Sequence, residues 1–329
     1  SLLWSFALPG AEDLPHHDLI KLRSGSVLVL AVDRVARTDY LLEVQPNGTV
    51  TWRWSFADHR DAFAGWNTEL ANPTHTNSIH ELPPNRWFAA GDERFRPGNL
   101  LVSARNLNTV FVIDRRSGEV VWQLSDGLDY QHEASMVREG DLGAGLVLLF
   151  NNGRNDLFGY RRSRVQAFDP RSGALTWEYS SPYFYSSVAG TAHKLPGRNV
   201  AVTSSHGGRV FEVTPEGRIV WEWTPPYLPM RVERLPLDHC PQLAALPPPQ
   251  DVEVRVAGDP RPFIDLELYA FALPEDYVLR EVERVERRLL RGSAGCRDLF
   301  LPPGAQLWAE WGLDAQRLAG RRISARFRA

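Results

Sequence analysis

The sequence predicts an all-β fold, a β-propeller of five to six four-stranded blades, followed by an α/β extension at the C-terminus. A hairpin pattern, with a glycine four residues before a tryptophan, occurs four times along the chain. Two further strand-like runs precede each hairpin. The 329 residues include 25 glycines and 24 prolines, a composition that suits many turns more than long helices.

Each repeated hairpin consists of an apolar strand, a turn with glycine where a positive φ is needed, and a second strand that ends in tryptophan. Asp114 and Asp169 lie at turn positions and are expected to form turns rather than to act as acids. A large ring on the outermost strand can pack between blades. The glycine and tryptophan pairs are Gly48 and Trp52, Gly118 and Trp122, Gly173 and Trp177, and Gly217 and Trp221.

With the two preceding strands, each hairpin completes a unit of about 45–60 residues, which is the size of a propeller blade. Four blades are therefore clearly visible. The preceding strands are expected at Asp18–Leu22 and Ser26–Val32, Asn77–Leu82 and Asn99–Ala104, Ala134–Val137 and Leu146–Phe150, and Gly190–Leu195 and Asn199–Ser204.

We place the propeller in residues 1–249 and the α/β extension in residues 250–329. Leu2–Phe6 resembles the end of a fourth strand but has no hairpin before it. We expect it to close the ring as the outer strand of the last blade, which would remove open sheet edges. In the extension, Glu275–Arg291 has apolar residues at helical spacing and predicts an amphipathic helix. The extension either completes the last blade or blades or forms a small appendage.

The bulk properties exclude some partners and leave others open. A net charge of −3 and a pI of about 6.3 indicate no basic surface for nucleic acid. No apolar run approaches the ~18 residues that a membrane span needs. The chain begins at Ser1 without Met, which leaves room for a leader or membrane anchor before it. Cys240 and Cys296 fit either one disulfide or two buried thiols. The sequence does not indicate an oligomeric state.

Polar residues at the starts of the innermost strands are the candidates for a shared site, because these strands line the central channel of a propeller. Three histidines, His17, His75 and His132, recur there at nearly equal spacing. The sequence leaves open whether His16 or His17 faces the channel. The full set of candidates is His16, His17, Asp18, His75, Asn77 and His132.

Arg105 emerges at the end of a second strand and is a candidate for binding an oxyanion such as sulfate or phosphate, through its planar fork. The alternative is an arginine that is solvated or bridges two blades. Single histidines on strands are more often structural than catalytic, but three at equivalent positions favour function. A histidine cluster can also bind a transition metal, although the positive charge of Arg105 argues against one.

The combination of motifs resembles the bacterial arylsulfate sulfotransferase family over about residues 1–240. The resemblance implies a six-bladed periplasmic or otherwise exported propeller with a funnel-shaped site. It implies an enzyme that moves a sulfuryl group from an aryl sulfate to a phenolic or other acceptor through a sulfohistidine, without cofactor or metal. The motifs are His17-Asp, His75-Thr-Asn-Ser, Leu-Val-Ser-Ala-Arg105, Gln-His132 and Phe-Asn-Asn-Gly153.

The resemblance also implies a role for each matching residue. His132 corresponds to the histidine that is sulfurylated, His75 and Arg105 to the residues that hold the sulfuryl oxygens, and His17 to the remaining active-site histidine. Asn151 stands where an acidic residue is usual. The expected substrate-binding residues are Thr76, Asn77, Asn152 and Tyr185, with Tyr130, Phe158 and Tyr183 as further aromatic candidates for holding the aryl ring.

Two other functions stay open at this point. One is a non-catalytic propeller that binds a ligand or a protein, in which the histidines are structural. The other is a diverged propeller enzyme with metal chemistry or a different group transfer.

Overall fold

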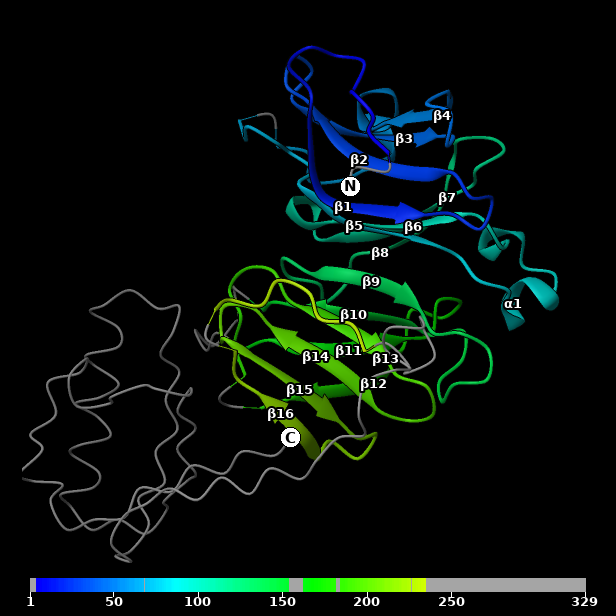
Figure 1. Cartoon of the computed structure of the whole chain (residues 1–329). Helices are drawn as coiled ribbons and strands as arrows, with labels where there is room; N and C mark the ends of the chain where they lie inside the picture. The colour runs from blue at the N-terminus through cyan, green and yellow to red at the C-terminus, as the bar shows by residue number, and fades with distance from the viewer. Residues whose placement is uncertain (1–3, 68, 154–161, 182–183, 226, 235–329) are drawn as a thin grey trace, which may run out of the picture. The chain divides into compact units, whose positions relative to one another are not determined.

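The computed structural model describes residues 4–67, 69–153, 162–181, 184–225 and 227–234, and within them sixteen strands form four antiparallel four-stranded sheets (Figure 1). This confirms the four blades that the hairpin repeat predicts. The predicted extension 250–329 and both cysteines lie outside the described residues, as do Phe158 and Tyr183.

In every sheet the order of the strands follows their order in the chain. Short helical segments lie between some of them: α1 (Arg86–Ala89) and three 3-10 turns, η1 (Phe56–Ala62), η2 (Glu93–Phe95) and η3 (Arg105–Leu107). The sheets are β1 (Leu14–Lys21), β2 (Val27–Asp33), β3 (Thr38–Val44) and β4 (Val50–Ser55); β5 (Thr76–Glu81), β6 (Leu100–Ala104), β7 (Thr109–Ile113) and β8 (Val120–Leu124); β9 (His132–Met136), β10 (Val147–Asn151), β11 (Arg164–Phe168) and β12 (Leu175–Ser180); and β13 (Thr191–Lys194), β14 (Val200–Ser204), β15 (Arg209–Val213) and β16 (Ile219–Trp223).

The chain divides into two compact units, one up to Val200 and one from Ala201 on, with the boundary inside the fourth sheet. In the first unit the innermost strands are neighbours in sequence order. β1 lies beside β5, β5 beside β9, and β9 beside β13. Adjacent inner strands are typical of propeller blades, and they bring residues far apart in the sequence to one place.

The hairpin turns have the chemistry that the repeat predicts. Asp114 Oδ1 accepts hydrogen bonds from the backbone N–H groups two and three residues later, at 2.8 and 3.2 Å. Asp169 makes the same pair of bonds at the same two distances. Gly118 and Gly173 follow with φ of 79° and 72°, a conformation that strongly favours glycine. Both aspartates therefore stabilise turns.

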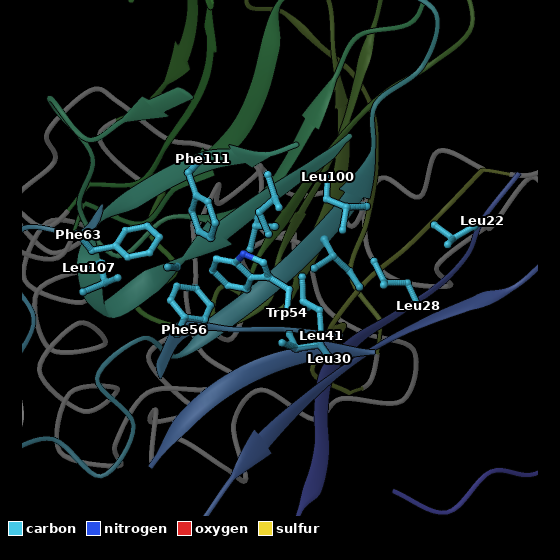
Figure 2. Packing of buried hydrophobic residues seen from close by; sticks show 14 residues of the cluster. Leu22, Leu28, Leu30, Leu41, Trp54, Phe56, Phe63, Leu100, Leu107 and Phe111 are labelled. Carbon is cyan, nitrogen blue, oxygen red and sulfur yellow. The ribbon is translucent and has the colours of Figure 1, made fainter. Parts of the chain in front are cut away.

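The hydrophobic core lies between blades and is rich in large rings. Figure 2 shows Trp54 and Phe56 packed with Phe111, which reaches the cluster from the second sheet. Trp54 is 3% exposed, and its Nε1 donates to the carbonyl of Gly118 at 2.8 Å, so an outer strand of one blade is bonded to the turn of the next.

The second and third sheets are joined in the same way, through Trp122 Nε1 and the carbonyl of Pro170 at 2.6 Å. In the first sheet this bond belongs to Trp54, two residues after the tryptophan of the repeat motif. Trp52 itself is half-buried, with the guanidinium of Arg115 5.0 Å above its ring. Inter-blade packing of a β-strand tryptophan is thus confirmed, with a shift of position in the first blade.

The N-terminal segment differs from its prediction. Residues 4–6 of the expected closing strand form no strand. Instead, Phe6 and Leu8 pack against a buried apolar cluster on the first sheet that includes Tyr40, and Trp4 Nε1 donates to the carbonyl of Pro46 at 3.1 Å. The cluster residues alternate along β2 and β3 with those of the inter-blade core, so they lie on the opposite face. That face is apolar, and the N-terminal segment covers it.

We expect Trp122→Phe to lower the free energy of unfolding by about 1–3 kcal/mol, because a buried carbonyl loses its donor and the core loses volume. Urea unfolding measures this change. Trp223→Phe is the matched control, since Trp223 is 39% exposed on an outer strand. A control that is destabilised as much as Trp122→Phe would contradict the role of the inter-blade hydrogen bond.

Candidate active site

Three inner strands of the first unit, β1, β5 and β9, are irregular where the candidate histidines lie. The pairing of β1 with β2 shifts register between Pro15 and Leu19, and that of β5 with β6 between Thr76 and Ser78. β9 and β10 shift in the same way next to His132. Such bulges redirect side chains and are common beside active sites.

Backbone strain accompanies these bulges. His17, His75 and Tyr130 have φ of 54°, 43° and 56°, in the left-handed region that non-glycine residues rarely adopt. Each such residue costs on the order of 1 kcal/mol and persists only where the surrounding structure enforces it. The strain marks the inner end of three successive blades and points to a functional cluster there.

His132 begins β9, and its hydrogen bonds define which ring nitrogen carries the proton. Nδ1 lies 2.7 Å from Asn152 Oδ1 and 3.0 Å from the carbonyl of Tyr130. Asn152 Nδ2 donates to the carbonyls of Ser186 and Ala189 at 2.7 and 2.8 Å, so its oxygen must face the imidazole. Nδ1 therefore carries the hydrogen, and Nε2 keeps a lone pair that can attack an electrophile.

The environment keeps His132 neutral. Burial lowers the pKa of its imidazole to about 3. The positive charge of Arg105 also lowers this pKa, whereas the hydrogen bond to Asn152 raises it. At neutral pH the ring is therefore uncharged, which a nitrogen nucleophile requires.

His17 and His75 pack edge to face, with ring centroids 4.8 Å apart. Burial, then His17 and Arg105, lower the pKa of His75 to about 4. The pKa of His17 is also lowered, first by burial and then by His16. Three largely neutral imidazoles thus lie near one permanent cation.

That cation is Arg105, at the start of η3 directly after β6. Its backbone N–H donates to the carbonyl of His75 at 3.2 Å, and its Nη1 donates to Asn106 Oδ1 at 2.7 Å. The guanidinium lies 4.3 Å above the ring of Tyr130, whose carbonyl accepts from His132. Tyr130 therefore links the arginine to the candidate nucleophile, and the arrangement suits an anionic group bearing several oxygens.

Several of the remaining predicted residues make hydrogen bonds to neighbouring strands and loops. Thr76 and Asn77 are buried: the N–H of Thr76 donates to Asp39 Oδ2 at 2.6 Å, and Asn77 Nδ2 donates to the carbonyl of Gln131 at 2.8 Å. Asp18 Oδ2 accepts from the N–H of Ile79 at 2.9 Å and so ties β1 to β5. Tyr185 is half-buried next to Ser186. Substrate contact by Thr76, Asn77, Asn152 and Tyr185 stays a prediction.

Asn151, the departure from the family pattern, has a structural role. Its Oδ1 accepts from the N–H of Asp129 at 2.9 Å, and its Nδ2 donates to the carbonyl of Gly127 and to Gln166 Oε1, both at 2.8 Å. An aspartate could not make the two donations. Asn152, one residue later, is the one that faces His132.

Sequence reasoning missed Asp39, which is fully buried in β3. Its carboxylate accepts from Asn72 Nδ2 and Thr74 Oγ1 at 2.7 Å, from the N–H of Thr76 at 2.6 Å, and from His16 Nε2 at 3.0 Å. Burial alone raises the pKa of the Asp39 carboxyl, but the hydrogen bond and charge of His16 and the other donors bring it below its ordinary value. The only sequence signal was an acidic residue directly before the apolar run Tyr40–Leu42.

The two consecutive histidines have different partners, and which of them faces the channel stays a prediction. His16 bonds to Asp39, whereas the ring of His17 contacts that of His75. The two neighbours also meet each other, with their Nδ1 atoms 2.7 Å apart.

Within the described residues, no group of three or more His, Cys, Asp or Glu side chains is arranged to hold a metal ion. The same part of the chain contains no helix with the length and apolar character needed to cross a membrane.

Fold and site together define a propeller-type protein with a histidine and arginine cluster suited to an anionic group. A family description, Arylsulfotransferase (ASST), matches residues 25–225, which is more than half of the chain. The protein belongs to the arylsulfotransferase family, which supports a sulfotransferase-like transferase function in general. No functionally curated protein matches the chain significantly.

Several solved structures are distantly similar. A Bacteroides caccae protein of unknown function is 15% identical, with a TM-score of 0.45 over 67% of this chain and 70% of that one. A catalytically inactive virginiamycin B lyase from Staphylococcus aureus, with quinupristin, is 17% identical, with a TM-score of 0.40 over 67% and 58% of the two chains. The WD40 β-propeller domain of Doa1 is 12% identical, with a TM-score of 0.36 over 57% and 47%. These values are too low to transfer an activity.

The lowered pKa of His132 predicts an acid sensitivity of the fold. As the pH falls below 6.5, the unfolded chain takes up a proton at this histidine, whereas the folded protein does so only near a pKa of about 3. The folded state should therefore lose about 1.5 kcal/mol from this one group between pH 6.5 and about pH 5. Urea unfolding of the wild type and His132→Leu at the two pH values measures it. The variant should lose correspondingly less stability on acidification, and an equal loss in both proteins would contradict the buried neutral imidazole.

Proposed function

We propose that the protein transfers a sulfuryl group from an aryl sulfate to a phenolic acceptor through a covalent intermediate on His132. The observation that carries the proposal is the pair of hydrogen bonds that Asn152 makes around His132: they place the hydrogen on Nδ1 and leave Nε2 with a lone pair, on an imidazole that the charge of Arg105 reaches. Membership of the arylsulfotransferase family supports it. We also propose an exported location, on the resemblance of the motifs to the bacterial family.

In the first half-reaction, Nε2 of His132 forms a bond to sulfur while the bond from sulfur to the aryl oxygen breaks. The ring gains positive charge as the nitrogen to sulfur bond forms. Its Nδ1–H then donates more strongly to Asn152 and to the carbonyl of Tyr130, so these acceptors stabilise the intermediate more than the resting imidazole. The guanidinium of Arg105 supplies charge for the sulfuryl oxygens.

In the second half-reaction, an acceptor phenol gives up its proton and its oxygen attacks the same sulfur. The nitrogen to sulfur bond breaks and returns neutral His132. Dividing the transfer in this way replaces one difficult displacement with two easier ones. A neighbouring imidazole takes or gives the proton at each stage.

Incubation with 4-nitrophenyl sulfate in the absence of acceptor tests the intermediate. We expect intact mass to rise by ~80 Da, the mass of SO₃, with the added group on the peptide that contains His132. His132→Asn should show no adduct.

His59→Gln is the matched histidine control for this experiment. His59 bonds to the carbonyl of Ser55 and stacks on Trp54, with ring centroids 4.6 Å apart, so its role is in packing. The control should form the adduct as the wild type does. If the wild type forms no adduct with several aryl sulfates and releases no phenol, the proposed function is wrong.

Substitution of Asn152 separates the tautomer from the mere presence of the histidine. Asn152→Leu removes the nearer of the two acceptors for Nδ1–H and leaves only the carbonyl of Tyr130. We expect the rate of adduct formation to fall by about tenfold or more, because the proton is then held less strongly on Nδ1. Asn152→Asp keeps an acceptor there and should retain more activity than Asn152→Leu. Single-turnover phenol release measures both rates, and equal rates in the two variants would contradict the role assigned to the Asn152 oxygen.

A further inference from the structure

The active-site cluster includes a pair of consecutive histidines whose geometry the proposed transfer does not yet use. In a regular strand, the side chains of neighbouring residues point to opposite faces. The register shift in β1 and the left-handed backbone of His17 instead bring the rings of His16 and His17 together, with Nδ1 atoms 2.7 Å apart. The strained backbone of His17 thus accompanies a direct contact between the two imidazoles.

The other end of His16 is fixed by Asp39. That carboxylate is fully buried and already accepts from three further donors, so it faces His16 Nε2 as an acceptor. Nε2 of His16 must therefore carry hydrogen. The chain of hydrogen bonds runs from Asp39 through His16 to His17, whose ring contacts His75.

Only one hydrogen fits between the two Nδ1 atoms, and it has two possible owners. If it belongs to His17, then Nε2 of His17 has a lone pair and can accept a proton. If it belongs to His16, then neutral His17 carries its hydrogen on Nε2 and can donate it. The two forms differ by one proton. When His16 holds the shared hydrogen, His16 is an imidazolium and neutral His17 is the acid; when His17 holds it, His16 is neutral and His17 is the base.

We propose that Asp39 and His16 form a proton relay that lets His17 act as the acid in the first half-reaction and as the base in the second. This inference rests on the proposed sulfuryl transfer and assigns its proton steps. His17 is the group that meets the substrate, and Asp39 and His16 are positioning residues that act through it.

The proton balance closes over one cycle. In the first half-reaction, His17 Nε2 gives its proton to the departing phenolate, and the hydrogen of His16 Nδ1 passes to His17 Nδ1. In the second, the acceptor phenol gives its proton to His17 Nε2, and the Nδ1 hydrogen of His17 returns to His16. One proton leaves with the product phenol and one enters from the acceptor.

The relay also explains where the positive charge resides. A charge held on His17 would lie close to Arg105, which opposes it. On His16 the charge lies against the carboxylate of Asp39, 3.0 Å from Nε2. His17 therefore exchanges protons while staying neutral between steps.

The decisive variant is His16→Gln. A glutamine amide can donate to Asp39 and its carbonyl can accept from His17 Nδ1–H, so both hydrogen bonds are kept, but no proton can pass through it. His16→Ala removes both bonds. His59→Gln is the control, because His59 packs on Trp54.

Single-turnover phenol release is measured with two donors. Phenyl sulfate needs a proton on its leaving oxygen, whereas 4-nitrophenyl sulfate can depart as the phenolate. We expect His16→Gln to slow reaction with phenyl sulfate by about 10²-fold and with 4-nitrophenyl sulfate by less than about threefold. A variant that loses both activities equally, or neither, would show that His16 only positions His17 and would overturn the relay.

A second measurement is independent of turnover. In protein labelled with ¹⁵N at histidine, the shared hydrogen should produce a coupling between the two Nδ1 nuclei, and His16→Gln should abolish it. Absence of the coupling in the wild type overturns the relay whatever the activity. A wild type that shows the coupling but forms no adduct overturns the proposed function, and with it the role of the relay in sulfuryl transfer.

Discussion

The buried carboxylate of Asp39 is the constraint on which the candidate site depends. It receives hydrogen bonds from His16 in β1 and from three residues that lead into or begin β5, so it fastens the inner ends of two blades to each other. A fully buried charge is costly unless donors surround it, and here four do. Because the same residues set the backbone around His17 and His75, the pair of imidazoles that meet edge to face depends on this one interaction.

The third blade uses neutral hydrogen bonds for a related purpose. Two backbone carbonyls orient the amide of Asn152, and the amide oxygen then orients His132. Burial and the nearby arginine keep that imidazole uncharged. The two halves of the cluster thus differ in kind: a buried carboxylate faces His16, and a neutral amide faces His132. The proposed acid–base and nucleophilic steps use this division.

Much of the fold could be predicted because the hairpins of each blade have sequence patterns that depend only on neighbouring residues. A turn that needs glycine at a positive φ and an aspartate that accepts from the following N–H groups recur at fixed offsets, and they identify the hairpins without any tertiary information. The prediction of a closing strand at the N-terminus was wrong for residues 4–6. Similarity to the end of a strand does not tell whether the segment pairs with a sheet edge or packs on an apolar face. Here it was the apolar face beside Tyr40.

The sequence by itself determined the repeat, the four blades and the polar candidates: His17, His75 and His132 at the starts of innermost strands, and Arg105 at the end of a second strand. Only the tertiary structure decided what those residues do to one another. Bulges and left-handed residues overrode the strand alternation that would have separated His16 from His17. Asp39 bonds to His16, 23 residues before it, and Asn152 bonds to His132, 20 residues before it. These contacts exist only once the strands have paired. Tautomers and pKa values depend on such long-range neighbours, and no local pattern in the chain encodes them.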